Sequence, residues 1–185
     1  MPKTPSQTFI TTPAWEVYFG AVNETFSNAS TAVDTGDWTS IGVVQDDPTL
    51  GLDIEKAVIR ASNVTGPVRE PLFGRTFSWQ LDQAQWTKKS IENYFGGGTW
   101  ATSGSGEMWT AGSLASVEAA MLWVGIDQGT GLQIRIGHKR VSITPAGDIA
   151  FGTEDLIKLP VNVTALAPDT GADIYIWAST ALSAA

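Results

Sequence analysis

The residues of this 185-residue chain that could carry out chemistry are few. His138 is the only histidine, and it stands beside Lys139 and Arg140 after an alternating stretch. A Ser–His–Asp system needs a histidine next to an activated serine, and no Gly-x-Ser-x-Gly motif accompanies this one. We therefore expect His138 to be a surface or turn residue and not a general base.

The tripeptide Asp-Thr-Gly occurs twice, at 34–36 and 169–171. It resembles the catalytic turn of aspartic proteases, in which two carboxylates share a proton. In such sites Ser or Thr normally follows, whereas Asp37 and Ala172 follow here. Because Asp, Thr and Gly are common turn formers, two turns are the simpler interpretation.

Metal and nucleotide sites are also disfavoured. The chain has no cysteine, and its acidic pairs Asp34/Asp37 and Asp46/Asp47 lack the spacing of an EF-hand loop. The glycines at 96–98 follow a predicted helix, whereas a phosphate cradle needs glycines that precede one. The sequence thus predicts no catalytic, metal or cofactor site, and a protein that is not an enzyme.

Composition points to a globular chain that does not hold nucleic acid tightly. The net charge is −8, with 43% hydrophobic and 16% charged residues, so we expect one domain over residues 1–185. No basic patch stands out, which argues against tight DNA binding. Residues 1–13 read as an extended arm, without the apolar stretch of a signal peptide or membrane span. Synthesis in the cytoplasm and no membrane insertion are expected.

The elements are organised around residues 69–98. Phe77, Trp79 and Leu81 alternate with polar neighbours, which predicts a half-buried strand. A helix over 83–95 is predicted to follow, with Asp82 as its N-cap and Gln85 in a capping box. The apolar side of this helix would comprise Ala84, Thr87, Ile91 and Tyr94/Phe95, and the glycines at 96–98 would end the helix.

Further strands are predicted along the rest of the chain. In the one over 132–137, Leu132, Ile134 and Ile136 would face inward and Gln133 and Arg135 outward. The turn residues at 46–48 would break an earlier strand. The full set comprises 15–21, 38–44, 52–60, 117–126, 132–137, 141–144, 149–151, 156–166 and 174–178. Such spacing with one helix indicates a mainly β fold, an antiparallel sandwich or barrel with one short flanking α-helix.

Two long loops are predicted, over 23–37 and 99–113. The second carries Trp100, Met108 and Trp109 among Gly and Ser. Exposed aromatic residues on a loop either tuck back on the domain or meet a partner. These three are our candidates for an inter-subunit or inter-ring contact.

Several weak motifs share an order that resembles a known family. They read WEVYFGAV, DWTSIGVVQDDPTLGLDIEK, VTGPVREPLFGRTFSWQLDQ, YFGGG, VSITPAGDIAF and LIKLPVNVTAL. Their order between residues 15 and 177 resembles the major tail protein, or tail tube protein, of long-tailed, siphovirus-like bacteriophages. The loop at 99–113 departs from that pattern.

The resemblance implies a structural virion protein. Six copies would form a ring around a channel, and rings would stack through loops and arms into a genome conduit. The tube would be built around a tape-measure protein and would meet tail terminator and distal tail or baseplate proteins. DNA would pass without specific binding, and the protein, made in the host cytoplasm, would reside in the virion tail.

Within that resemblance, short and uncharged polar side chains are expected to line the channel. They are Thr76, Ser78, Gln80, Gln133, Asn162 and Thr164. DNA carries one phosphate charge per about 1.7 Å of axis, so a neutral or acidic wall would let it slide.

Two other functions fit the same sequence. One is the inner tube of a contractile tail or injection system, which differs by having a sheath partner. The other is a carbohydrate-binding β-sandwich, in which Trp38, Trp100 and Trp109 would stack on sugars.

Overall fold

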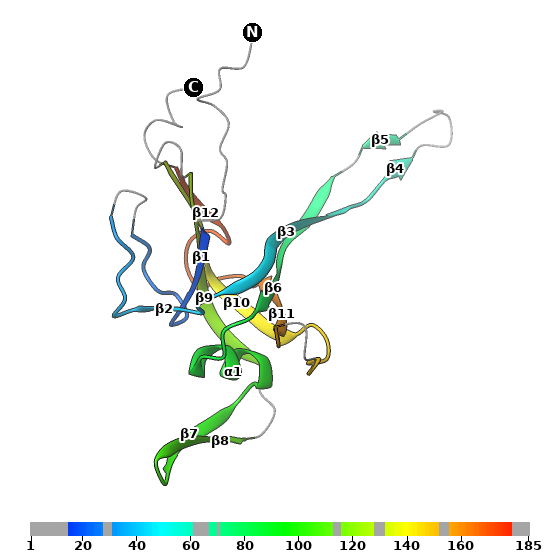
Figure 1. The fold of residues 1–185 in the computed structure, drawn as a ribbon. Helices are drawn as coiled ribbons and strands as arrows, with labels where there is room; N and C mark the ends of the chain where they lie inside the picture. The colour runs from blue at the N-terminus through cyan, green and yellow to red at the C-terminus, as the bar shows by residue number, and fades with distance from the viewer. Residues whose placement is uncertain are drawn as a thin grey trace.

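The computed structural model describes residues 15–27, 31–60, 67–69, 71–112, 116–127, 132–151 and 156–178 (Figure 1). The predicted arm at 1–13 lies outside these ranges. The elements in chain order are β1 (Trp15–Gly20), β2 (Trp38–Ser40), β3 (Val44–Lys56), β4 (Ile59–Arg60), β5 (Pro67–Arg69), β6 (Leu72–Gln83), α1 (Lys88–Phe95), β7 (Gly98–Ser103), β8 (Gly106–Ala111), β9 (Val117–Ile126), β10 (Gln133–Pro145), β11 (Leu159–Ala165) and β12 (Tyr175–Ala178).

One antiparallel sheet forms the body. Its strand order is β2-β1-β9-β10-β11-β6-β3, and β12 pairs with the first half of β10. Two separate two-stranded sheets, β4-β5 and β7-β8, project from it (Figure 1). The fold is mainly antiparallel β with a single short helix in the described ranges, as the sequence predicts.

The sheet curls, which brings its two outer strands close enough in space to be joined by a short link. β2 and β3 lie at opposite ends of the strand order, yet only residues 41–43 separate them. The carbonyl of Val43 accepts hydrogen bonds from the amides of Ala84 (2.9 Å) and Gln85 (3.2 Å), and the amide of Ile41 donates to Val17 (3.1 Å). This short link holds the two ends of the sheet together.

The core lies inside that curl. Val17 and Phe19 on β1 belong to the same buried cluster as Trp79 and Leu81 on β6, although three strands separate β1 from β6 in the sheet. A second cluster, which comprises Trp38, Ala120, Leu122 and Val124, covers the other face of β9. Because β9 is buried on both faces, its sequence is a nearly continuous apolar run.

The helix begins later than predicted. β6 continues to Gln83, and Thr87 is the N-cap, its hydroxyl accepting from the amide of Ser90 at 3.1 Å. The Ser90 hydroxyl binds the Thr87 amide in return at 2.7 Å, which completes a capping box. The predicted cap, Asp82, is instead a strand residue paired with Pro160. Gly96 ends the helix with φ 78°, as a glycine allows.

The prediction of an apolar side for the helix is also wrong. The buried helix residues are polar, Ser90 and Asn93, whereas Ile91 and Tyr94 are only half-buried. Asn93 Nδ2 donates to Oε1 of the buried Gln83 at 3.4 Å, so the helix docks partly through amides.

Three strand predictions need correction. β3 runs straight through residues 46–48, which form a bulge between Gln45 and Thr49 with Asp46 at φ 61°. β10 is continuous from 133 to 145, and residues 149–151 are not a strand. The predicted loop at 99–113 is largely the β7–β8 hairpin.

Two residues predicted to be outside are inside. Arg135 is buried, and its Nη1 donates to Ser27 Oγ at 2.7 Å and to the Ser27 carbonyl at 3.3 Å. His138 is fully buried and not a surface residue. Both have partners far away in the sequence, which no local pattern reveals.

Candidate functional site

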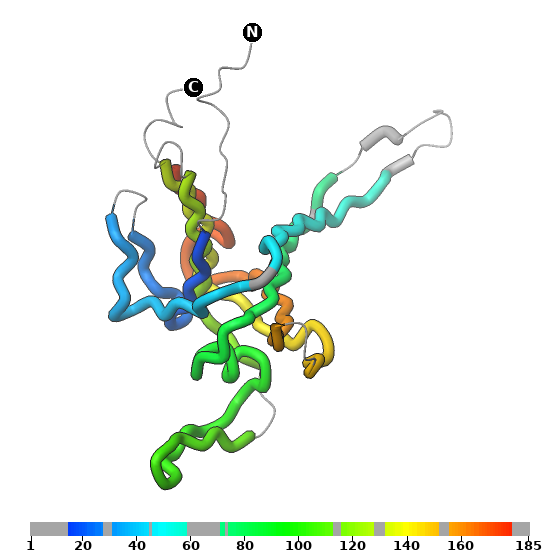
Figure 2. Tube along the Cα trace, viewed as in Figure 1, coloured from blue at the N-terminus to red at the C-terminus, as the bar shows by residue number. Residues whose placement is uncertain are grey.

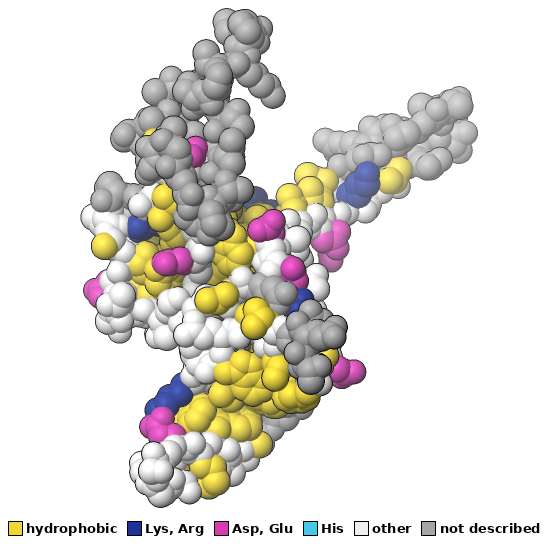
Figure 3. All heavy atoms as spheres, viewed as in Figure 1, with side chains coloured by type: hydrophobic (Ala, Val, Ile, Leu, Met, Phe, Trp, Pro, Cys, Tyr) yellow, Lys and Arg dark blue, Asp and Glu magenta, His cyan; other side chains and the backbone are white. Residues whose placement is uncertain are grey.

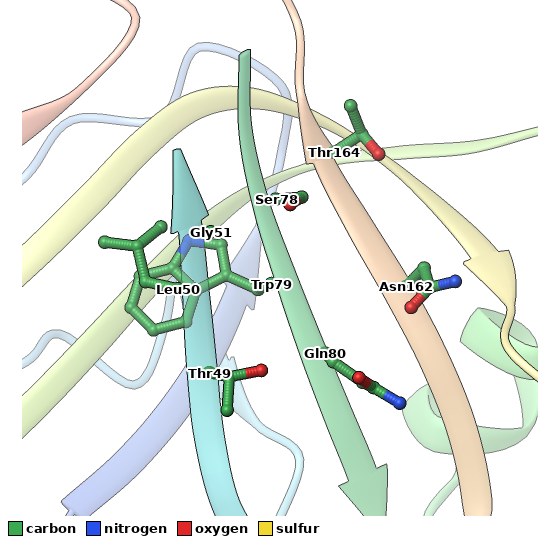
Figure 4. Close-up of a pocket in the computed structure, with 8 residues that line it drawn as sticks. All are labelled: Thr49, Leu50, Gly51, Ser78, Trp79, Gln80, Asn162 and Thr164. Atoms are coloured by element: carbon green, nitrogen blue, oxygen red, sulfur yellow. The ribbon is translucent and has the colours of Figure 1, made fainter. Parts of the chain in front are cut away.

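The polar face of β3, β6 and β11 gathers most of the residues predicted to line a channel. Ser78, Gln80, Asn162 and Thr164 line one open depression of about 380 Å³, together with Thr49, Leu50, Gly51 and Trp79. In Figure 4 Gln80, Asn162 and Thr164 lie on one side of the sheet, while Trp79 and Leu50 point to the other. Thr76 is exposed two residues before Ser78 on the same strand.

The strand register explains why these side chains lie together. Gln80 pairs with Thr49 on β3 and with Asn162 on β11. Ser78 pairs with Gly51 and Thr164 in the same way. Since directly paired residues point to the same face, the period of two in β6 produces two uncharged polar rows across three strands. We call this surface the polar face.

Gln133 does not belong to the polar face. It opens β10, opposite Ile126 of β9, and its Oε1 accepts from Arg135 Nη2 at 3.3 Å. Strand alternation shows on which side of a strand a residue lies, but not on which part of a curled sheet.

Cations near the polar face are held by carboxylates. Lys158 Nζ contacts Asp46 Oδ2 at 2.8 Å and Asp82 Oδ2 at 3.1 Å, and these hydrogen bonds raise the pKa of Lys158. Arg140 contacts Glu118 at 2.7 Å and Asp169 at 3.3 Å. At the far end of the same face of β3, Asp53 pairs with Thr76. The surface is thus uncharged at its centre and acidic at its margin.

The three residues of the predicted contact loop divide into two groups. Trp100 and Trp109 face each other across the β7–β8 hairpin and turn toward α1. Trp100 Nε1 donates to Glu92 Oε1 at 3.0 Å, and the ring of Trp109 packs at a tilt of 40° against Phe95, with ring centroids 5.4 Å apart. Met108 instead stays 52% exposed. In Figure 3 hydrophobic side chains gather over α1 and the base of this hairpin.

A second apolar surface was missed by the sequence analysis. The outer part of the β3–β6 hairpin extends beyond the body (Figures 1 and 2). On β3, Leu50, Leu52 and Ile54 are 39%, 53% and 45% exposed and face the same way. We call these three residues the apolar stripe. Their period of two was the available signal, but the predicted strand began only at residue 52 and left Leu50 outside it, whereas β3 begins at Val44.

Catalytic and metal chemistry find little support in this geometry. Within the described ranges, no group of three His, Asp or Glu side chains could hold a metal ion. Neither copy of Asp-Thr-Gly resembles a paired site: Asp34 Oδ1 accepts from the Gly36 amide within its own turn at 2.8 Å, and Asp169 binds Asn23 and Arg140. In the described part of the chain no helix is long and apolar enough to cross a membrane.

Comparison with known proteins identifies the family of this chain. A search of curated protein sequences returns no match. The family model described as phage tail tube protein matches residues 5–185, nearly the whole chain. Members of that family are structural components of the virion tail and assemble with themselves into the tube. The chain therefore belongs to the phage tail tube protein family.

Proposed function

We propose that this protein forms six-membered rings that stack into the tail tube of a long-tailed phage, with the polar face lining the channel. The tube encloses the tape-measure protein during assembly, is bounded by terminator and distal tail or baseplate proteins, and conducts the genome into the host. The subunit has no catalytic role.

The polar face is the observation that carries this proposal. Its central side chains are amides and hydroxyls without charge, and the neighbouring Lys158 and Arg140 are already paired with carboxylates. Within the described residues, a wall of this kind offers DNA phosphates no unpaired Lys or Arg, so the genome is not retained by the release of its counterions. On β6 and β11 the opposite face carries core residues, among them Trp79, Leu81, Val161 and Val163, so packing holds these two strands in place.

The apolar stripe supports assembly between copies. The three aliphatic side chains are exposed to water at a cost in free energy, and β3 itself is an edge strand with unpaired backbone groups. Contact with another subunit would bury the side chains and pair the strand edge. Trp100 and Trp109 tuck against α1, so Met108 and the outer face of the β7–β8 hairpin are the part of the predicted contact loop that remains for a neighbouring subunit or ring.

Electron microscopy of the purified full chain, alone and seeded with tail initiator complexes, tests this function. Tubes or stacked rings with sixfold symmetry are expected. A protein that stays monomeric under both conditions would contradict it. Copurification of a sheath protein with the assembled tube would favour a contractile tail, the closest alternative.

A further inference from the structure

His138 sits at the centre of a buried hydrogen-bond chain that joins three elements. Its side chain is fully buried on β10. Trp79 Nε1 on β6 lies 3.0 Å from His138 Nε2, and the backbone oxygen of Asp173 lies 2.8 Å from His138 Nδ1. The residues predicted to line the channel play no part in it.

The partners fix the protonation state of the imidazole. An indole N–H can only donate, so Nε2 of His138 must be the acceptor. A carbonyl oxygen can only accept, so Nδ1 must carry the proton. The ring is therefore neutral, and a second proton would place an N–H directly against the N–H of Trp79.

The chain ahead of β12 lies over the histidine. Asp173 contributes its backbone oxygen to His138, and its carboxylate receives two hydrogen bonds from Arg75 on β6, at 2.7 and 3.0 Å. β12 begins two residues later and pairs only through four residues of β10. Asp173 thus holds the start of β12 through two contacts, a buried one with His138 and an exposed one with Arg75.

The charged and titratable groups around His138 come from three strands and from the segment ahead of β12. β6 brings Arg75, the segment ahead of β12 brings Asp173, β12 brings Tyr175, and β10 itself brings Lys139 and Arg140. Arg75 and Asp173 neutralise each other, and Arg140 is paired with Glu118. On β9 the residue opposite His138 is Met121. Among these described groups the one carboxylate is that of Asp173, which is already paired with Arg75 and offsets the cost of burying an imidazolium only in part.

We propose that His138 is a proton-controlled clasp, whose protonation opens residues 166–174 and detaches β12 from β10. β10 is paired with β9 along most of its length and with β11 at its second half, so the segment that covers the charged ring opens more readily than β10 shifts. Opening leaves residues 134–137 of β10 without the partner strand, a free edge able to pair with another chain. The inference does not depend on ring formation.

The direction of the pH dependence follows from burial. Burial lowers the pKa of His138, and its contact with Asp173 only partly offsets this. The open form binds the proton with an ordinary histidine pKa of about 6.5. The closed form is therefore fully favoured above that pH and is lost as pH falls toward the pKa of the closed form.

Hydrogen exchange of the full chain at pH 7.5 and 5.5 provides the test. After correction for intrinsic exchange, protection of the β12 amides (Tyr175–Ala178) should fall about tenfold at pH 5.5, the slope of one proton. The amides of β1 (Trp15–Gly20) are the internal control and should not change. Because the chain has one histidine, no other side chain of ordinary pKa titrates in this window.

Two variants separate His138 from its neighbours. His138→Asn should abolish the pH dependence of β12 exchange, while Asp173→Asn, which keeps the backbone carbonyl, should retain it. Should His138→Asn fail to fold, the imidazole resonances of the wild type are followed over the same pH range, and they should titrate in step with the loss of β12 protection. Unchanged β12 protection in the wild type, or a dependence lost in Asp173→Asn, would overturn the clasp.

Discussion

The backbone amide of Val43 donates a hydrogen bond to Oε1 of Gln85 at 3.1 Å, which ties the link between the outer strands to the chain entering α1. Gly42, the preceding residue, has φ 76°, and a Cβ built on it would lie 2.0 Å from that same Oε1. Any other residue at this position would strain the backbone at positive φ and would displace the Gln85 amide from its bond to Val43.

Gly42→Ala should lower the free energy of unfolding by about 2–3 kcal/mol, combining backbone strain with the displaced Gln85 side chain. Gly104→Ala is the matched control, since Gly104 also has positive φ (61°) but has nothing within 4 Å of a built Cβ. That variant should lose only about 1 kcal/mol. Urea unfolding of the subunit measures both, and equal losses would show that Gln85 contributes nothing.

Thr87→Ala should destabilise the protein by about 1 kcal/mol, because the amide of Ser90 loses its acceptor. Thr87→Ser keeps the hydroxyl and should remain close to the wild type. Thermal unfolding followed by circular dichroism distinguishes them. If the alanine variant were as stable as the wild type, the Thr87 cap would make no contribution to stability.

Ile54→Thr should leave the isolated subunit within about 0.5 kcal/mol of the wild type, since this side chain is exposed. In assembly it should raise the protein concentration needed for tube formation about tenfold, as expected for losing about 1.4 kcal/mol of apolar burial. Ile176→Thr, an exposed isoleucine outside the apolar stripe, is the control. Light scattering over a concentration series measures the threshold. Equal thresholds for both variants would exclude the stripe from the interface.

Ser78→Lys and Asn162→Lys should make assembled tubes retain DNA, because each adds six cations per ring to the proposed channel wall. Retention should weaken steeply with salt. Gln133→Lys carries the same charge but lies off the polar face, so its tubes should release DNA like the wild type. Genome ejection by phages carrying each variant is the measurement. Normal ejection by the phages with Ser78→Lys and Asn162→Lys would show that the polar face does not line the channel.

Much of the fold could be predicted where burial is one-sided and local. In β6 the alternation of Phe77, Trp79 and Leu81 with polar residues matches the buried and exposed positions, because one face meets the core. β9 has the predicted boundaries, Val117–Ile126, since an apolar run buried on both faces admits few other conformations.

The errors arise where distant residues decide. Asp82 and Thr87 are both good caps, and the choice depends on pairing of Asp82 with Pro160 and its contact with Lys158. The polar run around His138 looks like a surface turn until Trp79 and Asp173 supply its partners. Four of the six predicted channel residues line one depression because β6 and β11 are neighbours, a fact of topology that alternation does not contain.

The pairing of β1 with β9 also bears on how the subunit folds. Tyr18 pairs with Leu122, so β1 must wait for most of the chain, whereas β9 and β10 can pair across a short connection. Closing so long a loop is entropically costly, and β-rich chains dominated by such non-local pairings fold in roughly milliseconds to seconds. During that interval the apolar face of β9 that packs on Trp38 lies open, which makes the newly made subunit most prone to aggregation before its first strand docks.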